Sequence, residues 1–192
     1  MLPLDLDDWL PRPQVRTRHR REASATPQQL WDAASRVRLD EAGTLGRAVR
    51  WRIPGLPAQR TFRAMFAQEP FTVLAEGDHW SVSGLVGRIW TLRRDYPPLG
   101  GPEDFGAWDH AGTARVLFAH WVEAAGDGRS ALVSEGRVAA VDRHAGMRLR
   151  ALWTVVAPFE RLIGGEALAL AASRAEREPP AAPSLDGRGD SR

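Results

Sequence analysis

Two long runs of strand-forming residues, joined by a tight turn, constrain the fold of this chain more than any other feature. The runs are TARVLFAHWVEAA (113–125) and SALVSEGRVAAV (130–141), and GDGR (126–129) lies between them. Gly and Asp readily adopt the positive φ angles that short hairpin turns require. The sequence therefore predicts an antiparallel hairpin over residues 113–141.

The order of the other elements extends this hairpin into a sheet with helices before and after it. A polar, extended run from Val15 to Ala25 precedes Thr26–Gln29, which has the form of a helix capping box. Short helical pieces are expected over 45–53 and 61–67, and β-like runs over 71–77 and 79–92. Asp142 has the position of an N-cap for a C-terminal helical region. Strand, helices, antiparallel strands and C-terminal helix in this order predict an α+β fold.

The last predicted helix, Pro158 to Glu176, contains two adjacent glycines. Gly164 and Gly165 lie near its middle, where together they cost roughly 2 kcal/mol relative to alanine. One interpretation is a soft turn that lets the helix shift and admit a ligand. The other is a weakness that the helix tolerates on its flank, and the sequence favours neither.

Composition indicates a single domain between two dissimilar ends. The chain has 192 residues, enough for one hydrophobic core. Residues 1–13 contain three prolines and are expected to lie extended over the body, which spans 14–177. From 178 to 192 the chain is rich in Pro, Gly and Ser, which predicts a disordered tail. Its RGDS sequence is short enough to be a chance occurrence.

The absence of cysteine, the small net charge and the lack of targeting segments restrict the possible functions. Cys is absent, which excludes disulfides, zinc thiolates and cysteine nucleophiles. The net charge is only +2, and the pI near 10.2 follows from cations that are all arginine rather than from strong basicity. Arg16–Arg21 (RTRHRR) is interpreted as a solvated strand rather than an anion-binding patch, and no nucleic-acid partner is expected. Without a secretory signal or a membrane-spanning run, a cytoplasmic location is expected.

Four charged residues can be assembled into a small network. Glu135 and Arg137 share one face of a strand, and Arg88 and Glu166 lie in neighbouring predicted elements. If Glu135 and Arg137 face inward, the four could recognise a carboxylate or phenol on a ligand through an arginine fork. The opposite strand phase is also possible, and a structural ion-pair network without a ligand is the favoured alternative.

Catalytic patterns are sparse. The five histidines show no metal-binding spacing, so no metal is expected, and no catalytic residue is assigned. His120 lies in a strand and is the one histidine considered as a general acid or base in a pocket. Glu103–Asp104 and Asp109–His110 cluster in one loop, which is interpreted as an acidic surface loop rather than a hydrolytic dyad.

Three segments carry a resemblance to a known superfamily: ATPQQLWDAA after the first strand, GLVGRIW in mid-sheet and SEGRVAAVDRHAGMRLRALW before the last helix. With the order of elements, they resemble the START-like (SRPBCC) superfamily, in particular its bacterial polyketide cyclase/dehydrase-like branch, over Val15 to Arg177. The resemblance implies a helix-grip fold, in which a curved antiparallel sheet wraps a long C-terminal helix and leaves a cavity for an apolar ligand. The candidate cavity residues are then Arg88, Trp90, His120, Glu135, Arg137, Trp153, Ile163, Glu166 and Leu170.

Three functions are considered, of which the first two follow from this resemblance and the third from the basic strand. The leading expectation is a binder or carrier of a small hydrophobic molecule (lipid, polyketide or aromatic) without a cofactor. The alternative is a cyclase or dehydratase that acts on a polyketide-like substrate in the same cavity. The third is an interaction module with a filled core that uses the Arg16–Arg21 strand on an anionic partner.

Overall fold

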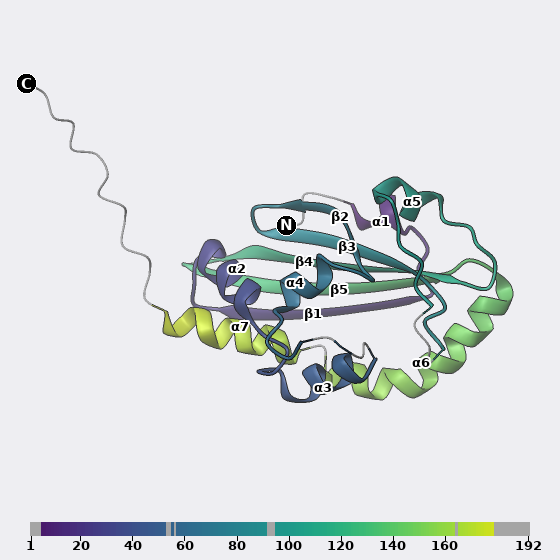
Figure 1. Ribbon diagram of the computed structural model, residues 1–192. Coiled ribbons are helices and arrows are strands. Elements are labelled where there is room, and N and C mark those ends of the chain that lie inside the picture. Colours follow the sequence, from purple (N-terminus) through teal and green to yellow (C-terminus); the bar gives the residue numbers. More distant parts are fainter. Residues whose placement is uncertain (1–4, 53–54, 56, 92–94, 164, 179–192) are drawn as a thin grey trace, which may run out of the picture.

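A five-stranded antiparallel sheet forms the centre of the computed structural model (Figure 1), which describes residues 5–52, 55, 57–91, 95–163 and 165–178. The side chains of residues 51, 52 and 158–163 are not described. The strands lie in the order β1-β5-β4-β3-β2. Their bounds are β1 Val15–Ala23, β2 Thr72–Gly77, β3 Trp80–Gly87, β4 Ala114–Gly126 and β5 Arg129–Ala140. The antiparallel sheet predicted from the sequence is confirmed.

The predicted hairpin is the longest pairing of this sheet. β4 and β5 pair from Ala114↔Ala140 to Gly126↔Arg129. Between them Gly126, Asp127 and Gly128 have φ angles of 80°, 50° and 72°. Positive φ at successive positions is what glycine permits without a steric cost. The GDGR sequence therefore closes the hairpin as predicted.

Seven helices surround the sheet in the described residues, and several begin where the sequence predicts. Thr26 accepts a hydrogen bond from the Gln29 amide, and Gln29 accepts one from the Thr26 amide, which completes the capping box. Asp142 Oδ1 accepts from the Ala145 amide at 2.8 Å. The bounds are α1 Leu6–Trp9, α2 Pro27–Arg36, α3 Gly43–Arg52, α4 Phe62–Phe66, α5 Pro102–Ala107, α6 Arg143–Ile163 and α7 Glu166–Arg177.

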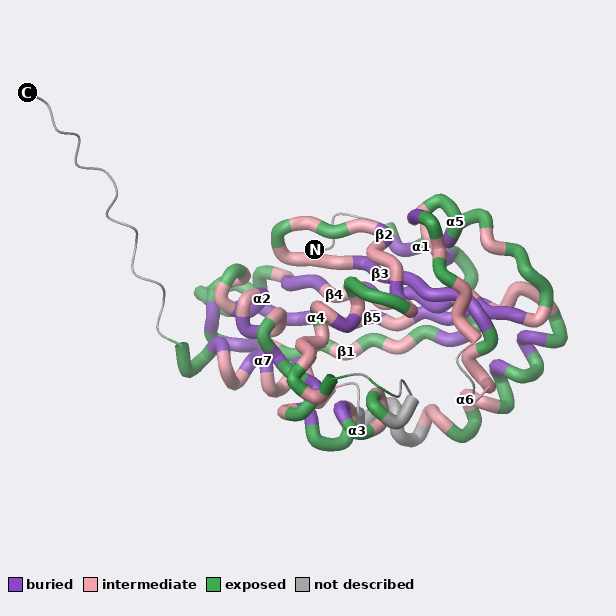
Figure 2. The backbone as a smooth tube through the Cα atoms, in the orientation of Figure 1, coloured by how far each residue is buried: buried purple, intermediate pink, exposed green. Residues whose placement is uncertain are grey.

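Both faces of the sheet are covered. We call the face that carries Leu132 and Val138 the inner face, and the face that carries Val133 and Ala139 the outer face. On the inner face Leu132 joins a cluster with residues of α2 and α7, and Val138 joins one with residues of α4 and α6. On the outer face Val133 packs with residues of α1 and α5. The central strands are consequently the most buried part of the backbone (Figure 2).

The N-terminal segment is not wholly extended, contrary to the expectation. Residues 6–9 form the helical turn α1, which Asp5 caps by accepting from the Asp7 amide at 2.8 Å. Leu6 and Leu10 are 4% and 0% exposed. Burial of these two leucines on the outer face stabilises the turn against the sheet. The predicted disordered tail, 179–192, lies outside the described residues.

The C-terminal helical region is divided in two at the glycine pair. α6 runs through Pro158 to Ile163, and α7 begins at Glu166 with Gly165 as its N-cap at φ −84° and ψ −14°. Gly164 lies outside the described residues. The prediction of one helix from 158 to 176 is therefore wrong, because α6 ends at Ile163 and α7 begins at Glu166. None of the described helices is both long enough and apolar enough to cross a membrane.

Candidate functional site

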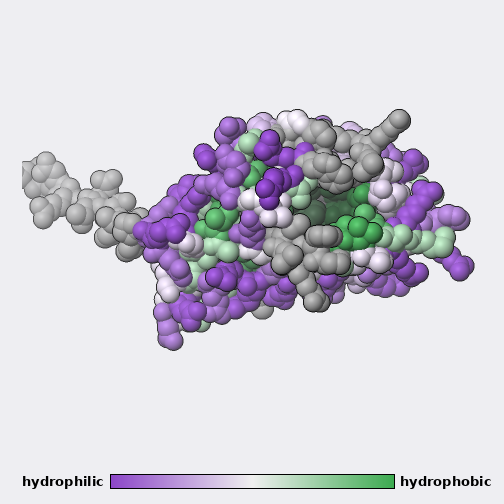
Figure 3. All heavy atoms as spheres, turned by 90° about the horizontal axis from the view of Figure 1, so that it is seen from below, coloured by the Kyte–Doolittle hydropathy of each residue, from purple (hydrophilic) through white to green (hydrophobic). Residues whose placement is uncertain are grey.

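A cavity of about 360 Å³ lies between the inner face of the sheet and the helices α2, α3, α4, α6 and α7. Val116 and Phe118 of β4 form part of its floor, and Trp31, Phe66, Trp153 and Leu168 line it from the helices. Seen from below, this side of the molecule is hollowed, with hydrophobic residues in and beside the hollow (Figure 3). The chain therefore has the helix-grip arrangement, a sheet that curves around C-terminal helices with a cavity between them.

The phase of β5 decides which side chains reach this cavity. Leu132, Ser134, Gly136 and Val138 line it, whereas the residues between them face outward. Of the two phases that the sequence allowed, the one that turns the charged pair away from the cavity is observed. Arg137 also borders the cavity, but its guanidinium bonds to α1 on the outer face.

Glu135 and Arg137 form a buried ion-pair network beneath α1. Arg137 Nε lies 2.7 Å from Glu135 Oε1, and Arg137 Nη1 donates to Asp7 and, at 3.2 Å, to the carbonyl oxygen of Leu10. Arg16 Nε also reaches Glu135 Oε1 at 2.8 Å. Burial alone would lower the pKa of Arg137, but hydrogen bonds and charge from Glu135 and Asp7 raise it. This network fastens α1 to the outer face of the sheet.

Arg88 and Trp90 follow β3 and lie outside the cavity. Arg88 is half-exposed and pairs with Asp95, with Nη1 and Oδ2 3.4 Å apart. Trp90 packs at the margin of a core cluster, and its buried indole N–H has no hydrogen-bond partner among the described residues. Neither residue is among those that line the cavity.

Glu166 and Leu170 of α7 also lie elsewhere. The Glu166 carboxylate accepts from the amides of Leu45, at 2.8 Å, and Thr44, at 3.2 Å. A carboxylate at this position satisfies the free amides of the first turn of α3 and interacts favourably with its dipole. Leu170 packs against the core between α2 and α7. The side chain of Ile163 lies outside the described residues.

Three of the sequence candidates, His120, Arg137 and Trp153, are among the residues that line the cavity. The neighbours of His120, Ala119 and Trp121, pack on the outer face, so alternation turns His120 inward. Its ring centroid lies 4.7 Å from that of Phe66. Burial lowers the pKa of His120 to about 4, because an imidazolium would lose its hydration there. At neutral pH the imidazole is therefore uncharged and keeps one nitrogen as an acceptor.

The cavity also includes polar residues that the sequence analysis did not single out. Ser81, Ser134 and His19 lie in the same cross-strand row as His120, one on each of β3, β5 and β1. Register alone brings them together, and no local motif marks it. Arg63 stands at the cavity margin, half-exposed, with Glu76 Oε2 at 3.7 Å from its Nη2.

The Arg16–Arg21 strand divides its residues between two environments. Thr17 and His19 line the cavity. Arg16, Arg18 and Arg20 lie on the other side and form ion pairs, with Glu135 at 2.8 Å, Glu123 at 3.4 Å and Glu22 at 2.5 Å respectively. Because these guanidinium groups are already paired and the core is not filled, the structure does not support the interaction module expected as a third possibility.

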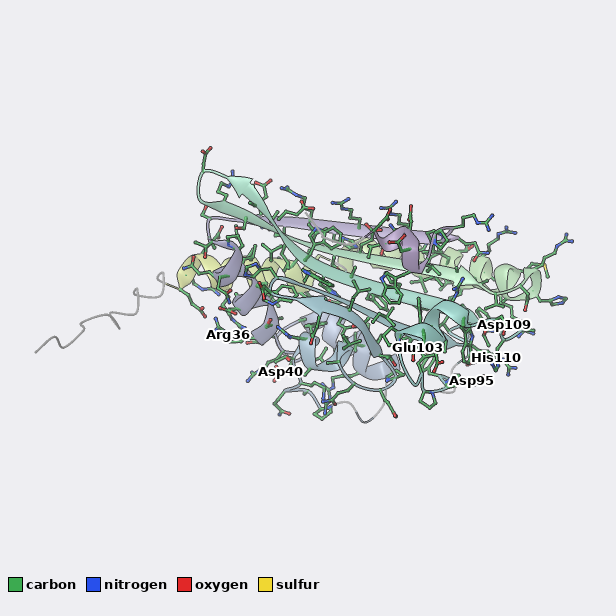
Figure 4. All side chains as sticks on the ribbon, turned by 90° about the horizontal axis from the view of Figure 1, so that it is seen from above. Arg36, Asp40, Asp95, Glu103, Asp109 and His110 are labelled. Atoms are coloured by element: carbon green, nitrogen blue, oxygen red, sulfur yellow. The ribbon has the colours of Figure 1, made fainter. Side chains whose placement is uncertain are left out.

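The acidic loop residues are not among those that line the cavity. Asp95, Glu103, Asp109 and His110 gather at one end of the molecule, away from Arg36 and Asp40 (Figure 4). His110 stacks on Trp108 with ring centroids 4.1 Å apart. Asp104 accepts from the Gly100 amide at 2.7 Å. Within the described part of the chain, no group of three or more His, Asp and Glu could hold a metal ion.

Comparison with known proteins finds similarity at the level of fold. No family model matches the sequence, and no curated protein matches it. The similar solved structures include TTHA0849 from Thermus thermophilus (12% identity, 84% of this chain and 97% of that chain, TM-score 0.33), the Zhui aromatase/cyclase from Streptomyces sp. R1128 (15%, 85% and 94%, 0.34) and norcoclaurine synthase from Thalictrum flavum (15%, 85% and 84%, 0.30). At these TM-scores the activities of the three proteins carry no argument for this chain.

Proposed function

We propose that the protein binds a small hydrophobic molecule in the cavity between the inner face of the sheet and the helices. The observation that supports this is the cavity itself, about 360 Å³ of space lined mainly by apolar side chains. Ligand sites typically measure roughly 300–1,000 Å³ and are lined in the same way, with a few polar groups. A volume at the lower end of that range favours a compact ligand over a long-chain lipid.

The side chains around the cavity favour a flat ligand. Trp31, Phe62, Phe66, Phe118 and Trp153 present aromatic rings to it. The ring centroid of Phe66 lies 5.1 Å from that of Phe118 and 4.7 Å from that of His120. Offset or edge-on contacts with further rings would add about 0.5–1.5 kcal/mol each to the burial of apolar area. An aromatic compound is therefore the best-matched occupant.

A substitution that fills the cavity tests this proposal. Ala34 on α2 lines the cavity, whereas Ala151 on α6 is exposed. We expect the wild-type protein to enhance the fluorescence of N-phenyl-1-naphthylamine, an uncharged apolar probe. Ala34→Phe should weaken its binding at least about tenfold, and Ala151→Phe, the matched control, should not change it. Equal binding by both variants would place the probe elsewhere and overturn the proposal.

A cyclase or dehydratase is the second candidate function, because an uncharged imidazole lies in the cavity. His120 could take a proton from a bound substrate at neutral pH. Carriage and catalysis differ in the fate of the ligand. A carrier releases its natural ligand unchanged after long incubation, whereas an enzyme releases a product of different mass or structure, and His120→Phe should then abolish conversion while binding persists.

A further inference from the structure

We propose that the cavity is selective for uncharged phenols, whose hydroxyl group hydrogen-bonds to His120 and its two flanking serines. This inference rests on the proposed function and names the ligand class and its orientation. It follows from the polar atoms that the sheet register places side by side on the cavity floor, and from the scarcity of charge around them.

Three of the four polar side chains of the cross-strand row lie on the adjacent strands β3, β4 and β5, and His19 of β1 follows Ser134 as the fourth. Ser81 of β3 is the partner of His120 of β4, and His120 is the partner of Ser134 of β5. Directly opposed residues have Cβ atoms roughly 4.5–5.5 Å apart. A serine hydroxyl therefore lies on each side of the imidazole, all three groups on the inner face.

These three groups are open to a ligand. No side-chain hydrogen bond to another described residue is found for Ser81, His120 or Ser134, and none of their polar atoms is among the fully buried, unpaired ones. Each residue is partly accessible although it lies within a strand. Since all three line the cavity, their accessible surface faces its interior. A ligand could therefore satisfy groups that the protein itself does not.

The chemistry of the row matches a hydroxyl group better than an anion. The low pKa of His120 keeps its imidazole uncharged, so it offers an acceptor nitrogen rather than a positive charge. A phenol donates one hydrogen bond and accepts others, and a serine hydroxyl can supply the latter. A carboxylate buried here would lose its hydration without gaining a counter-ion, which is strongly unfavourable.

The cations near the cavity are already engaged. Among the described lining residues the arginines are Arg63 and Arg137. Arg137 bonds to Glu135 and α1 on the outer face. Arg63 stands at the margin, 47% exposed, near Glu76 and with its guanidinium 5.6 Å from the Trp31 ring. Neither arginine is positioned to neutralise an anion at the polar row.

The remainder of the floor fits the aromatic body of such a ligand. Val116 lies four residues before His120 on β4, and Val138 of β5 is its partner. The cross-strand row that contains these two valines is wholly apolar on the inner face. At about 3.3 Å per residue the two rows are roughly 13 Å apart. Phe118 and Gly136 lie between them, and a Cβ at Gly136 would approach Thr17 Oγ1 to 3.0 Å. The floor is therefore polar at one end and apolar at the other, and Gly136 leaves room for the Thr17 and Phe118 side chains between the two ends.

A series of naphthalene derivatives tests the phenol selectivity directly. 2-Naphthol has the donor hydroxyl, 2-methoxynaphthalene keeps the oxygen without the donor, naphthalene has neither, and 2-naphthoate is charged. Measured by displacement of N-phenyl-1-naphthylamine at pH 7.5, 2-naphthol should bind about tenfold more tightly than 2-methoxynaphthalene and naphthalene. 2-Naphthoate should bind most weakly.

Two variants of His120 assign the selectivity to this side chain. His120→Phe should reduce the affinity for 2-naphthol to that for naphthalene while naphthalene still binds. His120→Gln, which retains an acceptor, should keep part of the preference. Equal wild-type affinity for 2-naphthol and 2-methoxynaphthalene would overturn the inference. Binding of 2-naphthoate more tightly than 2-naphthol would also overturn it. In both cases the proposed binding of apolar molecules in the cavity would stand. If none of the four compounds displaced the probe, the inference would fail together with the proposal that a compact aromatic compound is the occupant; the proposed function itself would fail if the wild-type protein did not bind the probe or if Ala34→Phe bound it as well as Ala151→Phe.

Discussion

Replacing His120 with phenylalanine should reduce the dependence of folding stability on pH between pH 7.5 and pH 5. Burial lowers the pKa of His120 from its ordinary value of 6.5 to about 4 in the folded protein. Between these values the unfolded chain binds a proton that the folded chain does not. His120 therefore opposes folding increasingly as the pH falls through 6.5 toward 4, and has almost no effect of this kind above pH 7.

The size of the effect follows from the two pKa values. The full shift corresponds to roughly 3 kcal/mol, reached only below the folded-state pKa. At pH 5 the unfolded chain is almost fully protonated at this position and the folded chain about one-tenth protonated. This difference gives a loss of about 2 kcal/mol relative to pH 7.5. The phenylalanine variant keeps a ring beside Phe66 and lacks the titration.

Urea unfolding at pH 7.5 and pH 5 measures this difference. The free energy of unfolding of the wild-type protein should fall by about 2 kcal/mol more than that of His120→Phe. His110→Gln is the control, because His110 is exposed at the surface. If wild type and His120→Phe lost the same stability, His120 would be solvated or paired, and the argument for an uncharged imidazole in the cavity would be refuted.

Two further experiments examine charged residues whose hydrogen bonds and ion pairs lie outside the cavity. Arg137→Met leaves Glu135 buried with Arg16 as its remaining partner. In urea titrations this variant should lower the free energy of unfolding by about 3–5 kcal/mol. Glu135→Leu combined with Arg137→Met should restore most of the lost stability. Comparable loss in the single and double variants would contradict the pairing. Glu166→Ala removes the acceptor for the α3 amides and should cost about 1 kcal/mol in the same titrations, with no change in probe affinity. A weakened probe affinity would place Glu166 at the ligand after all.

The hairpin and the helix starts could be predicted because their signals are local. GDGR requires nothing beyond its own backbone to turn, and the Thr26–Gln29 capping box completes itself within four residues. The α+β class followed from the order of such elements. Local chemistry sufficed wherever the residues that decide a feature are neighbours in the sequence.

The phase of β5 could not be predicted because both of its faces are buried. Leu132 on the inner face is 4% exposed and Val133 on the outer face is 0% exposed. Alternation reveals a strand's orientation only when one side is apolar and the other polar. Here α1, which belongs to a segment expected to be extended, covers the outer face. The Leu10 carbonyl accepts a hydrogen bond from Arg137, so that the Glu135–Arg137 pair can be buried on this face.

The residues on the C-terminal helix were misplaced for a different reason. Projection at 100° per residue assumes one continuous helix. α6 ends at Ile163 and α7 begins at Glu166, where Glu166 accepts from the amides of α3 and Leu170 packs against the core between α2 and α7. Ala167 and Leu168 line the cavity instead. A helical projection across a glycine pair thus selected the wrong face.

The separation of charge from the cavity has a consequence for specificity. Glu135, Arg137, Arg16 and Arg18 satisfy one another or Glu123 on the outer side of the sheet. With those charges directed outward, His120 has no acidic side chain among the described cavity residues to hold it protonated. The same strand phase that removes an arginine fork from the ligand therefore keeps the imidazole neutral, and a neutral acceptor in an apolar cavity selects a hydroxyl over a carboxylate.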